Sequence, residues 1–303
     1  MKISIAIPTF NAQHHIKPLL KKLYRQKLDN YISLEIIIVD SSSTDRTVEI
    51  IKSEFPDVKL KIIPNKNFNH GGTRNYLFSL TTGEYILFMT QDAIPYDDYL
   101  ISNLLSSFDE DGVLISYARQ IPKNDANKLE EFARFFNYPE HSIIKSKSNL
   151  KELGIKTFFN SNVCSMYNKE VFEKFNGFPE NIILNEDMIL ASKVILNGYK
   201  VHYNAKAKVY HSHNYSLKQQ FKRYFDIGMA FEQIDYLLKY ASNEKEGIKM
   251  TIKQLEYLIS KKEFKYIPYA ILENLVKYIS YNLGKKHHFL PYKFKKFLSA
   301  YLK

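Results

Sequence analysis

The chain of 303 residues is long enough to bury a full hydrophobic core, as one large domain or as one domain with an appendage. Hydrophobic residues make up 45% and charged residues 25%, as in ordinary globular proteins. The single cysteine, Cys164, excludes an internal disulfide framework and a zinc site made of cysteines. No stretch of about 18 uncharged apolar residues occurs, so we expect no membrane-spanning helix, and the apolar run at the N-terminus is too short for a signal peptide.

The net charge of +11 is spread unevenly along the chain. Residues 216–303 contain 17 Lys and Arg and 8 Asp and Glu, a net charge of +9, which leaves +2 for residues 1–215. This asymmetry suggests an anionic partner for the C-terminal region, with membrane lipid head groups or nucleic acid as the candidates.

The first ninety residues alternate between short apolar runs and amphipathic helical patterns. We expect strands over residues 3–7, 34–39, 58–63 and 84–89, and helices over 15–28, about 48–55 and 73–80. This alternation predicts right-handed βαβ units and a largely parallel sheet. No Gly-x-Gly-x-x-Gly turn follows the first strand and no P-loop motif is present, which disfavours a dinucleotide-binding Rossmann enzyme and a P-loop nucleotidase.

The pattern changes after residue 92. Further helices are expected over residues 97–108, 128–137, 169–175 and 186–197, and further strands over 112–118, 157–166 and, as an edge strand or two, 201–210. Residues 138–156 are polar and irregular. From residue 217 onward the chain is helical, basic and rich in aromatic residues, with breaks at Pro268 and Pro291. We therefore expect two parts, residues 1–215 and residues 216–303.

Polar side chains follow three of the predicted strands. They are Pro8, Thr9 and Asn11 after the first strand, Asp40 and Ser42 after the second, and Thr90, Gln91 and Asp92 after the fourth. Because the carboxyl ends of parallel strands meet at one edge of a sheet, these groups should converge there. Arg74, near a helix N-terminus, would add a cation suited to phosphate. Taken singly, Asp40 and Asp92 are equally explained as turn formers or helix caps, but together the groups indicate a nucleotide pocket.

Several of these segments, in this order, resemble the inverting family 2 glycosyltransferases with the GT-A fold. The segments are residues 5–11, 37–45, 74–75 and 90–92, and the resemblance spans roughly residues 1–215. Residues 68–75 with 90–93 look most like the bacterial rhamnosyltransferase branch. The resemblance implies an α/β, Rossmann-like fold with a mixed, mainly parallel sheet flanked by helices, and a C-terminal helical extension.

The resemblance also implies a donor site for a nucleotide-diphospho-sugar. Thr9, Asn11 and Asp40 would line the base and ribose pocket, with Pro8 and Ser42 beside them, and Arg74 would approach the pyrophosphate. Thr90-Gln91-Asp92 stands where the family has Asp-x-Asp, so the first carboxylate is missing. Asp92 alone can still ligate Mg²⁺ or Mn²⁺ when diphosphate oxygens and water complete the shell.

The remaining site residues are assigned through the same resemblance. Residues 185–188 resemble the family's Glu-Asp motif, so Asp187 would be the general base and Glu186 a supporting or acceptor-binding residue. The alternative is that both acids only complement a helix dipole. Asn160 and Asn162 would bind donor or acceptor hydroxyls.

A histidine late in the chain would complete the metal site. His211 lies where the family often supplies an imidazole to the metal or diphosphate, and His213 would point to the same face of an extended segment. A zinc site of two histidines and one aspartate is conceivable, but phosphate-bridged Mg²⁺ fits this setting better.

The implied activity is inverting transfer of a sugar, L-rhamnose from dTDP-L-rhamnose, to a hydroxyl of a cell-surface polysaccharide or a lipid-linked oligosaccharide. Another donor such as a UDP-hexose is the nearest alternative. Outside this class, the chain could be a nucleic-acid-binding module or a non-catalytic nucleotide-binding protein, although nucleic acid is not the expected partner. The basic aromatic helices suggest peripheral contact with the inner face of the cytoplasmic membrane, and otherwise a cytoplasmic protein whose aromatic residues pack on the catalytic part.

Overall fold

The computed structural model describes residues 1–240 and 243–302, the side chains of 243–245 excepted. In this part of the chain nine strands form one sheet, in the order β3-β2-β1-β4-β8-β6-β9-β5, with β7 paired to β9. The strands are β1 (Lys2–Thr9), β2 (Ser33–Asp40), β3 (Lys59–Ile62), β4 (Tyr85–Met89), β5 (Ile94–Pro95), β6 (Val113–Ile121), β7 (Ile143–Lys145), β8 (Cys164–Asn168) and β9 (Lys200–Tyr210).

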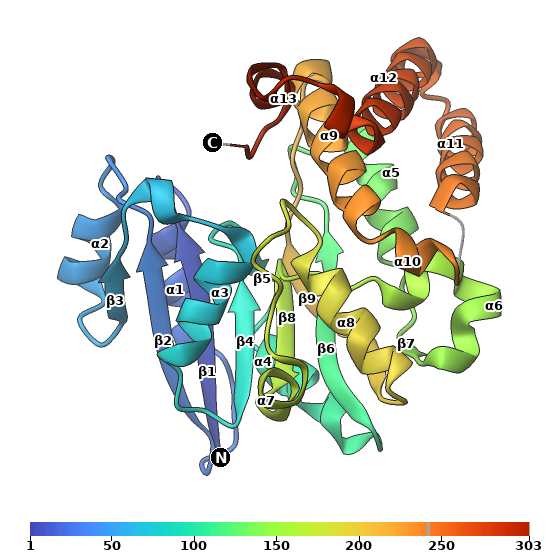
Figure 1. Ribbon diagram of the computed structural model, residues 1–303. Helices are drawn as coiled ribbons and strands as arrows, with labels where there is room; N and C mark the ends of the chain where they lie inside the picture. Colours follow the sequence, from blue (N-terminus) through green and yellow to red (C-terminus); the bar gives the residue numbers. More distant parts are fainter. Residues whose placement is uncertain (241–242, 303) are drawn as a thin grey trace.

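The N-terminal half of the sheet is parallel, as predicted. β1 pairs with β2 and with β4 in parallel, and β2 pairs with β3 in parallel. β8 then inserts antiparallel between β4 and β6, and β6 continues in parallel with β9. The carboxyl ends of β1, β2 and β4 therefore lie at one edge of the sheet, the upper edge in Figure 1.

Alternating side chains on the central strands separate two hydrophobic layers. Ile3, Ile5 and Ile7 pack on one face with the first helix, whereas Ile86 and Phe88 pack on the other face. Both faces are covered by helices, which explains why these strands read as nearly continuous apolar runs. The helices are α1 (Ile16–Tyr24), α2 (Thr47–Glu54), α3 (His70–Ser79), α4 (Leu100–Leu105), α5 (Lys128–Asn137), α6 (Leu150–Leu153), α7 (Glu170–Phe175), α8 (Glu186–Leu196), α9 (Leu217–Gln233), α10 (Asp235–Leu238), α11 (Asn243–Ser260), α12 (Ile267–Lys285) and α13 (Tyr292–Leu298).

Two predictions about the second half of the sheet are wrong. Residues 157–166 do not form one strand: residues 154–158 form a 3₁₀ helix and β8 begins only at Cys164. The buried side-chain nitrogen of Lys145 donates to the carbonyl oxygens of Lys156 and Phe159, so these backbone groups bond to a side chain and not to a neighbouring strand. β9 is also not an edge strand, since it lies between β6 and β5 and pairs with β7 as well.

The C-terminal helices pack on residues 1–215 rather than standing apart from them. Ala230 and Phe231 of α9, with Ile234 and Leu237 after it, join the same core as α8. α12 lies against α9, and α11 lies against α5 (Figure 1), where Tyr257 donates a hydrogen bond to Glu131 at 2.6 Å. Among the described residues, no helix is both long enough and apolar enough to span a bilayer.

Candidate active site

The ends of β1 and β2 meet through Asp40. Thr9 lies opposite Asp40 in the parallel register and donates its hydroxyl hydrogen to Asp40 Oδ2 at 2.8 Å. Ser43 donates to the same carboxylate from its backbone N–H at 2.8 Å and from its hydroxyl at 2.6 Å. Asp40 is fully buried, so its carboxylate shapes the loop after β2 and lies behind the surface that a ligand would touch.

Of the residues predicted for this corner, Asn11 and Ser42 are exposed. Both residues have a positive φ, 48° for Asn11 and 59° for Ser42, a conformation that residues other than glycine adopt rarely. Asn11 Oδ1 accepts a hydrogen bond from the Thr44 N–H at 2.9 Å, and Ser42 donates to the Ile63 carbonyl at 2.8 Å. The structure thus brings together the predicted base and ribose residues, with Asn11 and Ser42 facing solvent.

Gln91 joins the end of β4 to the loop after β1. Its Oε1 accepts from the Phe10 N–H at 2.8 Å, and its Nε2 donates to the Phe10 carbonyl at 3.0 Å. Thr90, half-buried beside it, donates its backbone N–H to the Val163 carbonyl at 3.1 Å. Both residues therefore brace the strand end, and Asp92 is the group of the motif that reaches a second cluster.

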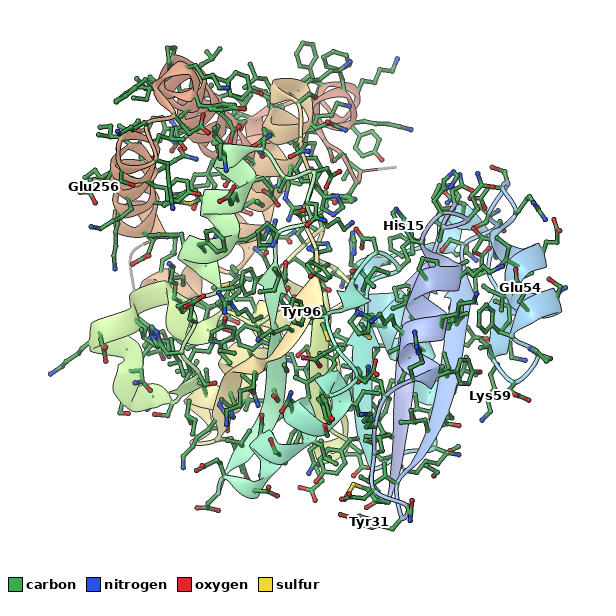
Figure 2. The ribbon with its side chains drawn as sticks, turned by 180° about the vertical axis from the view of Figure 1, so that it is seen from behind. His15, Tyr31, Glu54, Lys59, Tyr96 and Glu256 are labelled. Atoms are coloured by element: carbon green, nitrogen blue, oxygen red, sulfur yellow. The ribbon has the colours of Figure 1, made fainter. Side chains whose placement is uncertain are left out.

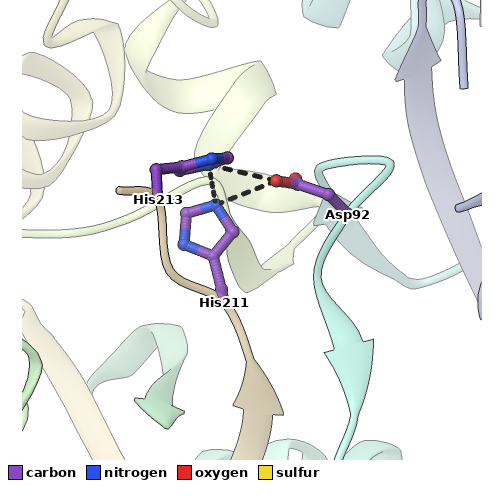
Figure 3. Close-up of side chains that lie close together, drawn as sticks. All are labelled: Asp92, His211 and His213. Atoms are coloured by element: carbon purple, nitrogen blue, oxygen red, sulfur yellow. Dashed lines mark hydrogen bonds and ion pairs between the residues drawn. The ribbon is translucent and has the colours of Figure 1, made fainter. Parts of the chain in front are cut away.

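Asp92, His211 and His213 form that cluster (Figure 3). Asp92 Oδ2 lies 3.1 Å from His213 Nε2 and 3.5 Å from His211 Nε2, and the two Nε2 atoms are 3.1 Å apart. One ligand atom of each residue lies within 4.8 Å of the others, so the three could hold one cation. The sequence had paired Asp92 with His211 and placed His213 on the same face, and the structure brings all three together.

The charge states in this cluster suit a metal ion. Burial acts to raise the pKa of Asp92, but its hydrogen bond to His213 and the nearby His211 prevail and hold that pKa well below its usual range. Burial lowers the pKa of His211 well below its ordinary value, so the imidazole is neutral and its lone pair can bind a cation. One carboxylate and two imidazoles fit Mn²⁺ or Zn²⁺, and Mg²⁺ less well.

Two basic residues lie near this cluster that the sequence had not indicated, Lys123 and His15. The backbone N–H of Lys123 donates to the hydroxyl of Ser212, between the two histidines, at 2.9 Å. His15, at the N-terminal end of α1 (Figure 2), is half-buried, and its pKa is lowered by burial and by the charge of Lys123. Both residues come from segments with no motif of their own, which is why sequence reasoning missed them.

Arg74 has a different partner from the expected pyrophosphate. Its guanidinium forms a buried ion pair with Glu186 at 3.0 Å and also donates to the His70 carbonyl at 3.0 Å. Burial acts to raise the pKa of Glu186, but the charge of Arg74 prevails and lowers it. Arg74 therefore connects α3 to the start of α8, where Asp187 follows.

Asp187 is only partly buried, unlike Glu186. Its Oδ2 accepts from the Asn162 N–H at 2.9 Å, and its Oδ1 accepts from the Met188 N–H at 2.8 Å. Burial and the negative charge of Glu186 raise the pKa of Asp187 to about 7. A carboxylate that takes up a proton near neutral pH is well matched to a general base.

Asn160 and Asn162 face inward. Asn160 donates to the Tyr167 hydroxyl at 2.7 Å and accepts from Ser165 at 3.0 Å. Asn162 donates to Glu186 at 3.2 Å and accepts from Tyr167 at 2.6 Å. Both side chains are 2% exposed, so their visible role is to hold Glu186 and the loop before β8.

The C-terminal tail forms a groove beside α3. Asp226 Oδ2 accepts from the N–H groups of Ala300 and Tyr301 at 2.8 and 3.2 Å, which fixes the tail, and the Tyr301 ring lies edge-on to His70 at 5.0 Å. The groove has a volume of about 180 Å³ and is lined by Phe68, Asn69, His70, Ile182, Ile183, Ala300, Tyr301 and Leu302. No local sequence signal indicated this contact between residues far apart in the chain.

Solved structures of similar shape show the fold. A mannosyltransferase of Pyrobaculum calidifontis, in complex with GDP-Man and Mn²⁺, matches with a TM-score of 0.63 over 94% of this chain and 86% of that chain, at 14% identity. TarS 1–349 of S. aureus, in complex with UDP, matches with a TM-score of 0.56 over 95% and 91%, at 17% identity. The sheet and its helices are the GT-A fold of glycosyltransferases, as predicted.

The sequence comparisons then give the family. The model of "Glycosyl transferase family 2" matches residues 4–175. The O-antigen chain rhamnosyltransferase RfbN of Salmonella typhimurium is 39% identical over 99% of this chain and 95% of its own length. The O-antigen chain rhamnosyltransferase WbaN of Salmonella anatum is 41% identical over 91% and 87%. The chain belongs to glycosyl transferase family 2 and is a glycosyltransferase, which takes a nucleotide-sugar donor and a glycan acceptor.

Proposed function

We propose that this enzyme transfers L-rhamnose from dTDP-L-rhamnose to a hydroxyl of a cell-surface polysaccharide or lipid-linked oligosaccharide, with inversion at the anomeric carbon. The similarity to two O-antigen rhamnosyltransferases over nearly the whole chain supports the donor and the acceptor class. The observation that carries the mechanism is the partly exposed Asp187, with a pKa raised to about 7.

In the proposed reaction Asp187 takes the proton of the acceptor hydroxyl. The hydroxyl oxygen forms the new bond to the anomeric carbon while the bond to the diphosphate oxygen breaks, and its electron pair leaves with dTDP. Attack from the side opposite the diphosphate inverts the anomeric centre. Arg74 holds Glu186 and thereby the start of α8, so its role is to position Asp187.

The leaving diphosphate is assigned to the side of Asp92. Asp92, His211 and His213 would hold Mn²⁺ or Mg²⁺, and such an ion supplies positive charge for the departing phosphate oxygens. The two imidazoles favour Mn²⁺ over Mg²⁺. Lys123 adds a further positive charge near the histidines. Asn11 and Ser42 would face the base and ribose, with Pro8, Thr9 and Asp40 forming the wall behind them.

The acceptor is assigned to the side of Asp187 away from the nucleotide. The groove between α3 and the C-terminal tail offers the Phe68 and Tyr301 rings, and aromatic faces pack well on sugar rings. Residues 1–215 would thus carry the donor site and residues 216–303 would complete the acceptor side.

A donor screen with point variants tests the proposal. Release of nucleoside diphosphate from dTDP-L-rhamnose should exceed release from any UDP-hexose and should fall when EDTA is added. Asp187→Asn should lower the rate about 10²–10⁴-fold and leave dTDP binding intact, because only proton transfer is removed. Asp92→Asn should weaken dTDP binding in the presence of Mn²⁺. Asp57→Asn, at an exposed position, is the matched control and should behave as wild type.

The other outcomes identify the alternatives. Faster turnover of a UDP-hexose would replace the donor assignment. Donor binding without turnover on any acceptor would indicate a non-catalytic nucleotide-binding protein. Salt-dependent oligonucleotide binding that survives Asp92→Asn would indicate a nucleic-acid-binding module.

The C-terminal helices support a second part of the proposal, peripheral contact with the inner face of the cytoplasmic membrane. Phe289 is 77% exposed, Phe297 68% and Tyr278 67%, and α13 also carries Lys293, Lys295 and Lys296. Exposed aromatic rings beside lysines fit an anionic lipid interface. Glu256 lies on the outer side of α11 (Figure 2), so the basic and aromatic surface is not uniform.

Vesicle sedimentation tests this contact. The protein should bind vesicles containing phosphatidylglycerol and not pure phosphatidylcholine, and Phe297→Ser should weaken that binding. Tyr31→Ser is the matched control, since Tyr31 is 66% exposed and lies at the opposite end of the molecule (Figure 2). Equal loss in both variants, or binding to neutral vesicles, would contradict a membrane-facing C-terminal region.

A further inference from the structure

The two histidines of the cluster lie on a segment, residues 211–214, in which each residue is hydrogen-bonded to residues 121–130. The His211 N–H donates to the Ile121 carbonyl at 2.9 Å, and the Ser212 hydroxyl accepts from Lys123 at 2.9 Å. The next two residues continue the pattern: the His213 N–H donates to Glu130 at 3.1 Å, and Asn214 accepts from the Asn127 N–H at 2.9 Å. The position of this segment is therefore set by residues 121–130.

The ring of His211 is held by Gln120. Gln120 is 2% exposed, and its Oε1 lies 2.9 Å from His211 Nδ1. The same Oε1 also contacts Arg134 of α5, whose guanidinium can only donate hydrogen bonds. That contact fixes the orientation of the Gln120 amide, because its oxygen must be the atom that faces Arg134.

The orientation of Gln120 fixes the tautomer of His211. Since Oε1 can only accept, His211 Nδ1 must carry the hydrogen, and the lone pair is left on Nε2. Nε2 is the atom that faces Asp92 and His213. A metal-binding imidazole needs this arrangement, with one nitrogen donating to a fixed acceptor and the other free for the cation.

The Glu130–Arg134 ion pair of α5 contacts both the backbone at His213 and the side chain of Gln120. Glu130 Oε1 accepts from Arg134 Nε at 2.7 Å and from the His213 backbone N–H at 3.1 Å. Arg134 also donates to Gln120 Oε1. The Nε2 of Gln120 in turn donates to the Tyr138 hydroxyl at 2.6 Å and to Ser161 at 3.0 Å. Ser161 precedes Asn162, whose N–H binds Asp187, so the same network also reaches the proposed base.

We propose that Gln120, Arg134 and Glu130 are positioning residues that hold His211 and His213 ready to bind a divalent cation. This inference rests on the metal site of the proposed function. Gln120 sets the ring orientation and the tautomer of His211, Arg134 sets the amide of Gln120, and Glu130 sets the backbone at His213. None of the three contacts the cation itself.

Binding of Mn²⁺ to the full-length protein, followed by the electron paramagnetic resonance signal of free Mn²⁺ with and without dTDP, tests the inference. Gln120→Leu should weaken binding 10–100-fold, the range measured for residues that support metal ligands. Gln120→Glu should restore it, because a carboxylate can accept from both His211 and Arg134. Arg134→Met should weaken binding about 10-fold. Lys128→Met, also on α5 but part of a more exposed pair with Glu131, should leave it unchanged.

Two further readouts separate positioning from general disruption. The ¹⁵N chemical shifts of the histidine rings should report the Nδ1–H tautomer for His211 in the wild type and its loss in Gln120→Leu. If Gln120→Leu does not fold, Arg134→Met and Gln120→Glu still decide the question. Wild-type Mn²⁺ affinity in folded Gln120→Leu or Arg134→Met would overturn the inference, whereas wild-type affinity in Asp92→Asn would overturn the metal site itself.

Discussion

The proposed catalytic role of Asp187 and its contribution to stability should change with pH in opposite directions. Its pKa is raised from an ordinary value of 3.8 to about 7, so the folded protein resists ionisation of this carboxyl more than the unfolded chain does. Its contribution to stability is therefore lost as the pH rises from about 4 to 7. As the proposed base, Asp187 must be ionised to act, so the transfer rate should rise over the upper part of the same range.

Asp187→Asn should therefore raise the thermal midpoint relative to wild type, by a difference that grows between pH 4 and 7 and is constant above pH 7. Thermal unfolding across this range measures it, and the wild-type rate of transfer against pH should rise with an apparent pKa near 7. A constant difference at every pH would show that the carboxyl titrates at its ordinary value.

The Arg74–Glu186 pair predicts a large loss of stability when one partner is removed. Both side chains are 6% exposed, so Arg74→Met leaves a buried carboxylate without its cation. We expect the free energy of unfolding in urea to fall by about 3–5 kcal/mol. Arg46→Met breaks the highly exposed Arg46–Glu49 pair and should produce no measurable change. Equal effects in the two variants would contradict the assignment of Arg74 as a buried structural residue.

At the scale of elements, the contact between α9 and α12 depends on two glycines. A Cβ at Gly284 would collide with the Phe225 carbonyl, and one at Gly228 would collide with the Tyr281 carbonyl. Gly284→Ala should therefore separate the helices and lower the free energy of unfolding by about 1–3 kcal/mol. Gly247→Ala, in α11 where nothing lies within 4 Å, should instead raise it by up to about 1 kcal/mol through helix propensity. Stabilisation by both substitutions would show that α9 and α12 have room to separate.

The elements of the first ninety residues were predictable because β1, β2 and β4 are buried on both faces and each helix is buried on one face. That produces apolar runs and 3.6-residue patterns that local sequence displays. The prediction of one strand over residues 157–166 was wrong because part of this backbone bonds to the side chain of Lys145, a contact that the local pattern does not indicate. The place of β8 between β4 and β6 also has no local signature, since it depends on which strands pair across long separations.

The arrangement of the candidate site was predictable where motifs follow strands and not where partners come from distant segments. Asp92 could be predicted from its place after β4. The position of His213 beside His211 could be predicted because alternate residues of an extended chain point to the same side. Arg74 and Glu186 are 112 residues apart, and nothing near Arg74 distinguishes a phosphate ligand from an ion-pair partner. No sequence motif indicates Gln120, because its proposed role depends on contacts with Arg134 and His211, which only the folded chain brings together.

At the scale of the whole molecule, the shared core predicts that residues 1–215 are not stable alone. Truncation after Tyr215 removes α9 and α10, whose residues Phe231 and Leu237 are buried in the same core as α8. It also removes α11, which covers α5. We expect the fragment to bind 8-anilinonaphthalene sulfonate and to lack a cooperative thermal transition, measured beside the full chain. A cooperative transition near the full-length midpoint would instead show that residues 1–215 form an autonomous domain.

The order of the strands has a consequence for the chain while it is being synthesised. β1, β2, β3 and β4 can pair as soon as about ninety residues have left the ribosome, but β4 then has no neighbour on its second side until β8, which begins at Cys164. For that interval its unpaired backbone groups and the apolar residues Leu87 and Phe88 form an open edge, the kind of surface on which nascent chains aggregate. Stalled chains of about 100–160 residues should therefore depend on chaperones far more than the finished enzyme does.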